Sequence, residues 1–156
     1  MGTCRMTQTT DEQILAVALP ILKVDEGCRL KAYQDTRGLW TVGFGHCFVA
    51  PDTVWTQAQA DAQLAEDVQS KITALDHTIP QWRELDPIRA SVILMMAFNL
   101  GVNGLLAFHN TLNFVWRGMF ALAAHNMLAS AWSTQVGDRA QRLAFMMRTG
   151  TIPVIK

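Results

Sequence analysis

Three residues between positions 26 and 41 have side chains that could together carry out acid–base chemistry. Glu26 is followed nine positions later by Asp35, and Thr41 comes six positions after that. Hydrolysis of a glycosidic bond needs such a set, because one carboxyl group protonates the leaving oxygen while a second group handles water or positive charge. A hydroxyl can donate and accept at once, so it can fix an attacking water. The spacing alone is weak evidence, since a Glu and an Asp occur nine residues apart in many proteins.

The local sequence predicts how Glu26 is positioned. Thr10 and Gln13 have the spacing of a capping box, which predicts a short helix that Pro20 ends or kinks. A second helix is predicted from Pro20 to Glu26, with Gly27 as its stop. The negative end of the helix dipole disfavours another negative charge, so we expect a raised pKa for Glu26. A general acid needs this property to keep its proton near neutral pH.

The remaining elements follow from turn residues and apolar periodicity. Short β-like runs over 29–44, around the turn formers at 35–38, predict a hairpin or a three-stranded sheet. Apolar residues at helical spacing over 56–76 predict one long amphipathic helix. Asp86 and Pro87 then predict the start of an apolar helix that reaches Leu100, with more helices beyond it. This order predicts an α+β fold with two lobes.

Length, charge and cysteine content limit the classes of protein. A chain of 156 residues with 50% hydrophobic residues predicts one globular domain. The 13 basic and 13 acidic residues balance, so no global field attracts nucleic acid or anionic lipid. Cys4, Cys28 and Cys47 are odd in number and lack metal-ligand spacing, which predicts neither a disulfide framework nor a metal site. Reduced thiols favour synthesis in a cytosol.

One segment is long and apolar enough to be read as a membrane span. Ala90 to Phe108 contains nineteen residues without a charge. Asn99, Gly101 and Gly104 interrupt it, so we interpret it as a buried helix, a turn and the start of a second helix. The apolar stretch 14–24 follows acidic residues, unlike a signal peptide. We therefore expect a soluble protein without stable membrane insertion.

The segment 25–46 closely resembles the active-site hairpin of the T-even phage lysozymes. The family's pattern of Asp-Glu-Gly, Arg-Leu-Lys, Tyr, Asp-Thr, Gly, Thr, Gly and Gly-His is present in register. A looser resemblance continues at Phe98, Gly101, Gly104, Phe108 to Asn110, Trp132, Arg139, Arg142 and Arg148 to Thr151.

The resemblance implies a two-lobed lysozyme fold. Residues 1–17 have no counterpart and are interpreted as an N-terminal extension, followed by a single domain over 18–156. Within it we expect a β lobe at about 28–56 and a connecting helix at about 57–77. The helical lobe is expected at about 80–156 together with the first helix.

The resemblance also implies an activity and catalytic roles. Glu26 corresponds to the family's proton donor, and Asp35 and Thr41 correspond to the residues that hold the attacking water, which implies inversion at the anomeric carbon. The implied substrate is bacterial peptidoglycan, cut at the β-1,4 bond between N-acetylmuramic acid and N-acetylglucosamine. The resemblance implies no metal and no cofactor.

Two supporting contacts are implied by the same match. Arg139 is expected to pair with Asp25 more than with Glu26 itself, and His46 is expected to pair with Asp67 on the long helix. We interpret both as structural, although His46 could equally be a loop histidine without a charged partner.

Four residues are candidates for sugar contacts, because pyranose rings stack on aromatic faces and amides bond acetamido groups. Asn99 stands where the family usually has glutamine, which shortens the reach of its amide. Most large aromatic side chains are simply core residues, which is the alternative for the three rings. The candidates are Phe98, Asn99, Phe108 and Trp132.

The leading interpretation is a monomeric endolysin made in the cytoplasm of the bacterial host. It would reach the cell wall after a holin-like protein permeabilises the membrane. One alternative is a lytic transglycosylase, which uses a single acid and no attacking water, and Asp35 and Thr41 argue against it. Another is a non-catalytic wall-binding module, against which the intact set of Glu26, Asp35 and Thr41 argues.

Overall fold

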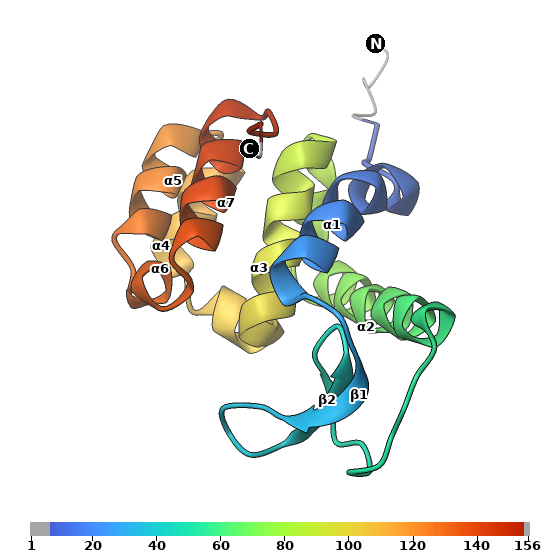
Figure 1. Cartoon of the computed structure of the whole chain (residues 1–156). Coiled ribbons are helices and arrows are strands. Elements are labelled where there is room, and N and C mark those ends of the chain that lie inside the picture. Colours follow the sequence, from blue (N-terminus) through green and yellow to red (C-terminus); the bar gives the residue numbers. More distant parts are fainter. Residues whose placement is uncertain (1–6, 155–156) are drawn as a thin grey trace.

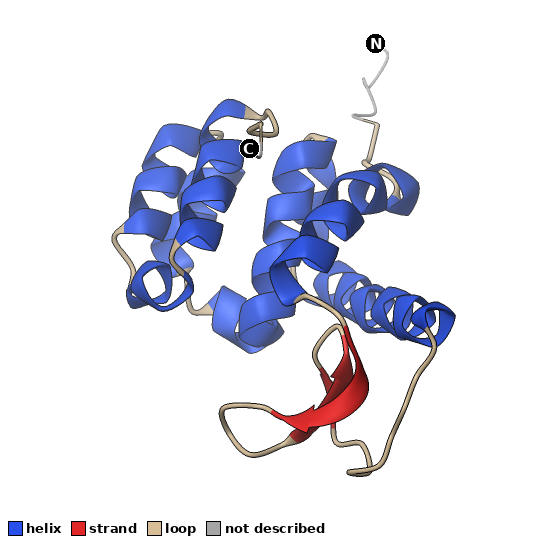
Figure 2. Ribbon diagram, in the orientation of Figure 1, coloured by secondary structure: helices blue, strands red, loops and turns tan. Residues whose placement is uncertain are grey.

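The computed structural model describes residues 7–154 and has a small antiparallel sheet beneath a larger group of helices (Figure 1). Figure 2 shows the strands confined to one end of the molecule and the helices filling the other. The strands are β1 (Arg29–Gln34), β2 (Trp40–Gly43) and β3 (His46–Cys47). The helices are α1 (Asp11–Glu26), α2 (Gln57–Thr78), the 3-10 turn η1 (Pro80–Glu84), α3 (Pro87–Leu106), α4 (His109–Trp116), α5 (Phe120–Leu128), α6 (Ala131–Val136) and α7 (Asp138–Thr149). The predicted α+β fold is confirmed.

The prediction that Pro20 divides the first helix is wrong, because α1 is one helix with Pro20 inside it. Its start is the expected capping box, in which the Thr10 hydroxyl accepts from the Gln13 N–H at 3.2 Å and the Gln13 side chain accepts from the Thr10 N–H at 3.0 Å. Proline removes one intrahelical hydrogen bond. Buried side chains on both sides of it hold α1 in the core: Ile14, Ala18, Ile21 and Leu22.

Part of the predicted N-terminal extension packs on the helical lobe. The Thr9 N–H donates to the carbonyl of Arg83 at 2.8 Å, and the Thr9 hydroxyl donates to the carbonyl of Leu85. Ile14 is fully buried. A division of the chain at residue 17 stays a prediction, and residues 1–6, with Cys4, lie outside the described part.

The sheet is a three-stranded antiparallel meander in the order β1-β2-β3, as predicted. Thr41, in the central strand, lies opposite Tyr33 on one side and Cys47 on the other. The turn between β1 and β2 is closed by the Asp35 N–H, which donates to the carbonyl of Leu39 at 2.9 Å. The sheet thus holds the residues around Asp35 and Thr41 in fixed register.

The long helix α2 connects the sheet to the helical lobe, and its apolar stripe is confirmed. Its start is a second capping box, formed by Thr56 and Gln59. The predicted stripe is the buried face of the helix: Ala60, Leu64, Val68, Ile72 and Leu75. Figure 1 shows this helix running beside the sheet and beneath α1.

Helix α3 lies in the centre of the helical lobe and contains most of the uncharged segment from Ala90 to Phe108. Asp86 caps it, accepting from the Arg89 N–H at 3.0 Å, and every residue over 90–97 is buried. Gly101 adopts a non-helical conformation with φ 74°, so a break divides α3 where a turn was expected. By length and composition α3 could cross a membrane, and half of its most apolar window is buried among the other helices. Core packing accounts for its apolar character.

Candidate active site

Glu26 is the last residue of α1, and the chain turns into the sheet directly after it. Gly27, with φ 62°, ends the helix. The side chain of Glu26 is only 20% exposed, and Oε1 lies 3.2 Å from Nη1 of Arg139. Burial raises the pKa of Glu26 most, the nearby Asp25 carboxylate raises it further, and Arg139 opposes the rise. The raised pKa expected for Glu26 is therefore found, with burial as its main cause.

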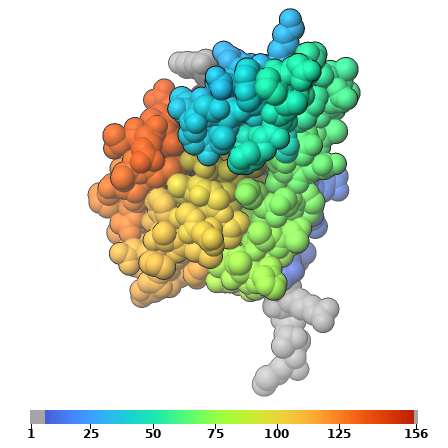
Figure 3. Space-filling model, turned by 90° about the horizontal axis from the view of Figure 1, so that it is seen from below, coloured from blue at the N-terminus to red at the C-terminus, as the bar shows by residue number. Residues whose placement is uncertain are grey.

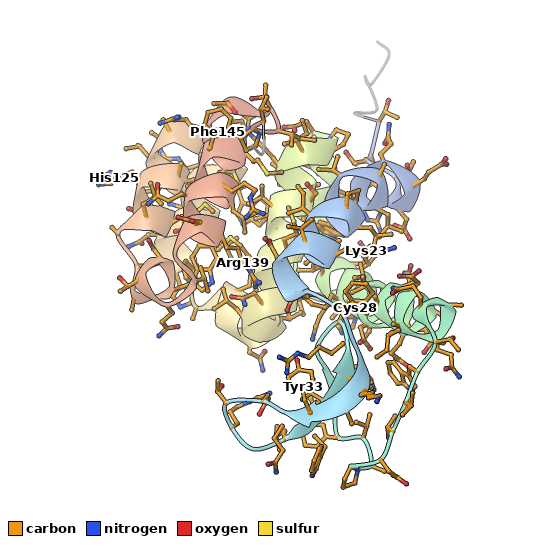
Figure 4. All side chains as sticks on the ribbon, in the orientation of Figure 1. Lys23, Cys28, Tyr33, His125, Arg139 and Phe145 are labelled. Carbon is orange, nitrogen blue, oxygen red and sulfur yellow. The ribbon has the colours of Figure 1, made fainter. Side chains whose placement is uncertain are left out.

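Asp25 forms a largely buried ion pair beside the acid. Its side chain is 7% exposed, and Oδ1 lies 2.6 Å from Nη1 of Arg142. Arg139 is farther away, with Nε 3.6 Å from Asp25 Oδ2, although its Nη2 donates to the Asp25 carbonyl at 3.1 Å. Figure 4 shows Arg139 between α7 and the end of α1.

These distances correct one expectation and add one residue. Arg139 was expected to pair with Asp25 more than with Glu26, but its guanidinium is closer to the Glu26 carboxylate. Asp25 has Arg142 as its main partner, which the sequence analysis did not single out. The signal was available, because positions 139 and 142 are one helical turn apart and share a face of α7.

Asp35 lies in the turn after β1, and hydrogen bonds hold it as a carboxylate. Its Oδ1 accepts from the N–H groups of Arg37 at 2.8 Å and Leu39 at 3.0 Å. Its Oδ2 accepts from the Arg37 side chain, from Nη2 at 2.9 Å and Nε at 3.2 Å. The Leu39 N–H lowers the pKa of Asp35 most, and Arg37 lowers it further. Sequence reasoning missed Arg37, which follows Asp35 by two positions in the same turn.

Thr41 is placed differently from the expectation. Its side chain is buried, 2% exposed, and it is absent from the lining of both hollows that contain Glu26. Its hydroxyl donates to the carbonyl of Leu39 at 3.0 Å. The N–H of Leu39 in turn donates to Asp35, so Thr41 is connected to the Asp35 carboxylate through the backbone of one residue, Leu39. The structure thus brings Glu26 and Asp35 to one hollow, whereas Thr41 is buried outside the lining.

Two open hollows have Glu26 in their lining. The first, of about 570 Å³, is lined by residues of the sheet, α2 and α3. The second, of about 530 Å³, runs along β1 and contains Asp35 and Tyr33. An added Cβ at Gly45, in the β2–β3 turn, would lie 3.7 Å from Glu26 Oε2, so this turn approaches the acid. Figure 3 shows two sides of the first hollow, the sheet residues in cyan and the end of α3 in yellow. We call these two hollows together the cleft.

His46 and Asp67 link the sheet to α2 at the wall of the cleft. His46 Nδ1 lies 3.0 Å from Asp67 Oδ2, so the expected pair is present, and Asp67 also accepts from Gln63 Nε2 at 3.0 Å. The ring of His46 contacts Trp55 at 5.6 Å between centroids. A connecting role for this pair is a proposal that the contacts support.

The four candidate sugar contacts fall into two groups. Phe98 and Asn99 line the cleft with Glu26. Trp132 is 4% exposed and lies outside the cleft lining, and its Nε1 donates to Asn99 Oδ1 at 2.7 Å. Phe108 is half-buried and meets Trp132 edge-on, with 6.0 Å between centroids. Trp132 and Phe108 therefore have the position of core residues that support Asn99 from behind.

Metal-ligand chemistry has no candidate in the described chain. Over residues 7–154, His, Cys, Asp and Glu form no group of three or more that could hold an ion. Cys28 and Cys47 have free thiols.

One carboxyl group with a raised pKa and one with a lowered pKa line the cleft beside a small sheet and a helical lobe, an arrangement that suits acid–base chemistry. Comparison with known proteins agrees, because the phage lysozyme family model matches residues 23–146. The chain belongs to the phage lysozyme family, which comprises peptidoglycan-cleaving enzymes.

Relatives of several kinds are similar to the chain. A probable T4-type lysozyme of Dictyostelium discoideum is 28% identical, over 87% of this chain and 96% of that protein. The pre-baseplate central spike protein of Enterobacteria phage T4 is also 28% identical, over 92% of this chain but only 29% of its own length. An endolysin of Acyrthosiphon pisum secondary endosymbiont phage 1 is 40% identical over 54% of this chain and 57% of that protein.

Proposed function

We propose that the protein is an endolysin that hydrolyses the β-1,4 bond between N-acetylmuramic acid and N-acetylglucosamine, with inversion at the anomeric carbon. Glu26 is the general acid, and Asp35 positions the water and balances the positive charge on the sugar ring. The observation that carries the proposal is the opposite behaviour of the two carboxyl groups on one cleft. Burial raises the pKa of Glu26, whereas hydrogen bonds lower the pKa of Asp35.

The contacts of Glu26 suit both its protonated form before the reaction and the carboxylate that remains after proton transfer. Its raised pKa keeps the proton available at the leaving oxygen, and the carboxylate left behind lies 3.2 Å from Arg139. Arg139 therefore stabilises the charge that forms during the reaction, in a site partly shielded from water. Because Arg139 also lowers the pKa of the resting acid, it limits how far burial raises that pKa.

Asp35 and Thr41 act on the opposite side of the scissile bond in this proposal. Asp35 is held ionised by the turn and by Arg37, so it can accept a hydrogen bond from water. Thr41 is a positioning residue, because its hydroxyl donates to the carbonyl of Leu39, the residue whose N–H donates to Asp35. In this proposal the attacking water bonds Asp35, and Thr41 does not contact the water directly.

The biological setting is part of the proposal. Endolysins are among the named relatives, which supports a protein made in the bacterial cytoplasm that acts on the wall. Passage through a membrane opened by a holin-like protein, and action as a monomer, complete this interpretation. Phe98 and Asn99 are proposed to contact the glycan from the α3 side.

Analysis of digestion products tests the reaction. Purified peptidoglycan is incubated with the protein, and the new ends are examined by mass spectrometry and by NMR at early times. Hydrolysis with inversion gives a free reducing end that is first formed in the α configuration, since the bond cut is β. A 1,6-anhydro end would show a transglycosylase, and an initial β anomer would show retention.

The variant Glu26→Gln tests the acid. General acid catalysis contributes about 10²–10⁴-fold, so kcat should fall by that factor while the fold is retained. Glu66→Gln on the exposed face of α2 is the matched control and should keep the wild-type rate. Equal rates for Glu26→Gln and the wild type would overturn the assignment of Glu26, and absent cleavage by the wild type would overturn the enzymatic function.

A further inference from the structure

Phe48, directly after β3, has a backbone conformation that its residue type disfavours. Its φ is 66°, and over residues 7–154 every other positive φ belongs to a glycine. A bulky side chain in this region clashes with the backbone, so such a residue is a true conformational outlier. Strain of this kind persists only where the surrounding structure enforces it.

The pairing of β2 and β3 shows what enforces the conformation. Cys47 lies opposite Thr41, while the N–H of Val49 donates to the carbonyl of Trp40 at 3.3 Å. One step along β2 therefore corresponds to two steps along the other strand, and Phe48 is the additional residue. This is the arrangement of a β-bulge whose first residue is left-handed, a position usually filled by glycine. Such bulges redirect a side chain.

Packing does not explain why a phenylalanine occupies this position. The side chain of Phe48 is 82% exposed and lies outside the hydrophobic core. It lines the cleft together with Glu26 and, from the α3 side, Phe98. The chain thus combines a strained backbone with an unburied aromatic ring at the edge of the catalytic groove.

We propose that Phe48 is a platform for one pyranose ring of the glycan strand, on the sheet side of the cleft. The inference rests on the proposed function and adds a specific sugar contact to it. The C–H face of a pyranose ring is apolar and matches the face of a phenyl ring, and their contact removes both from water. The bulge fixes the backbone that presents the ring, so the backbone does not have to reorganise on binding.

The shape and charge of the surroundings favour a sugar over a stem peptide at this position. One hollow lies on the α2 and α3 side of Glu26 and the other along β1, so a linear chain has surface available on both sides of the acid. Phe48 has neither a charge nor a hydrogen-bonding group with which to select a peptide carboxylate. Of the charged groups that line this hollow, Glu26 is paired with Arg139, Arg37 with Asp35 and Asp67 with His46. Lys71, on α2, lines the same hollow and has no ion pair among residues 7–154.

Three substitutions at position 48 test the platform. Phe48→Ala removes the ring and keeps the strain, Phe48→Gly removes both, and Phe48→Trp keeps an aromatic face. We expect KM on glycan strands freed of stem peptides to rise about tenfold in the Ala and Gly variants, as expected for partial burial of one large ring. The Trp variant should stay near the wild-type KM, and kcat should change less than about twofold in all three.

Thermal unfolding separates the binding role from a role in folding. Phe48→Gly should melt about 2–4 °C above Phe48→Ala, because glycine tolerates the left-handed backbone. A variant that is more stable yet binds equally poorly shows that the ring serves the substrate. Val54→Ala removes another exposed apolar side chain, 64% exposed and outside the cleft lining, and should leave KM unchanged.

Each outcome has a defined meaning. Unchanged KM in Phe48→Ala with active wild-type protein would overturn the platform and leave the proposed function intact. A KM increase seen only on glycan that carries stem peptides would assign Phe48 to the peptide and overturn the sugar contact. Binding of the Glu26→Gln protein to intact peptidoglycan, measured by sedimentation, should weaken when Phe48→Ala is added, and undiminished binding would also overturn the proposal.

Discussion

Arg142 Nη1 lies 2.6 Å from Asp25 Oδ1, and this contact leaves Arg139 free to serve as the partner of Glu26. Two arginines on one face of α7 thus divide two neighbouring carboxylates between them. Because Asp25 and Glu26 end α1, the pairs also attach the start of the sheet to the last long helix. The ion pairs at the cleft lead to four predictions.

Arg142→Gln should destabilise the protein. It leaves the largely buried Asp25 carboxylate without its main partner, which costs about 2–4 kcal/mol of unfolding free energy. Urea denaturation followed by circular dichroism measures the loss. Arg148→Gln, near the end of the same helix, is the matched control and should change the free energy by less than about 0.5 kcal/mol. Equal stability of the two variants would contradict the role of the pair.

Arg139→Gln should shift the alkaline side of the activity profile. Arg139 lowers the pKa of Glu26, so its removal raises that pKa further above the ordinary value. Glu26 must be protonated to act, and activity is lost as the pH rises through its pKa. The alkaline limb of kcat against pH should therefore move to higher pH, while kcat falls because the new carboxylate loses its partner. A limb that moves to lower pH would contradict this assignment.

Arg37→Gln should shift the acidic side of the profile. Arg37 helps lower the pKa of Asp35, so its removal raises that pKa toward the ordinary value, although the Leu39 N–H keeps most of the lowering. Asp35 acts as a carboxylate, so activity is lost as the pH falls through its pKa, and the acidic limb should move to higher pH. Arg37→Lys keeps a positive charge beside Asp35, so its acidic limb should lie between those of the wild type and Arg37→Gln.

The lowered pKa of Asp35 should also make the stability of the fold depend on pH. A carboxyl whose pKa is lower in the folded state stabilises the fold above its unfolded pKa, and this contribution is lost as the pH falls through the folded pKa. Melting temperatures of the wild type and Arg37→Gln should therefore converge in acid and differ at neutral pH. Convergence at neutral pH and divergence in acid would contradict the pairing.

Much of the fold was predictable because its signals are local. Capping residues such as Thr10 and Asp86 act through neighbouring backbone groups, so sequence spacing reveals them. Pro20 was misjudged because its effect depends on packing, and buried neighbours keep α1 intact there. Tertiary burial overrode the local preference of proline.

The site was predictable where a motif fixes it and not where distant segments meet. Glu26 and Asp35 lie in one continuous motif, whereas the bond from Trp132 to Asn99 joins residues 33 positions apart. No local pattern distinguishes a buried Trp that supports a cleft residue from one that stacks on a sugar. The strain at Phe48 depends on the pairing register of β2 and β3, which the sequence does not reveal.

The direction of α1 determines where another module could be joined. Helix α1 has 16 residues and ends at Glu26, so it is about 24 Å long at 1.5 Å per residue. Thr9 bonds the backbone of Arg83 in η1. Helix α1 starts on the side of the helical lobe away from the sheet (Figure 1). A tag or fusion partner introduced ahead of Thr9 would therefore emerge far from the cleft and leave long polymeric substrates free to enter.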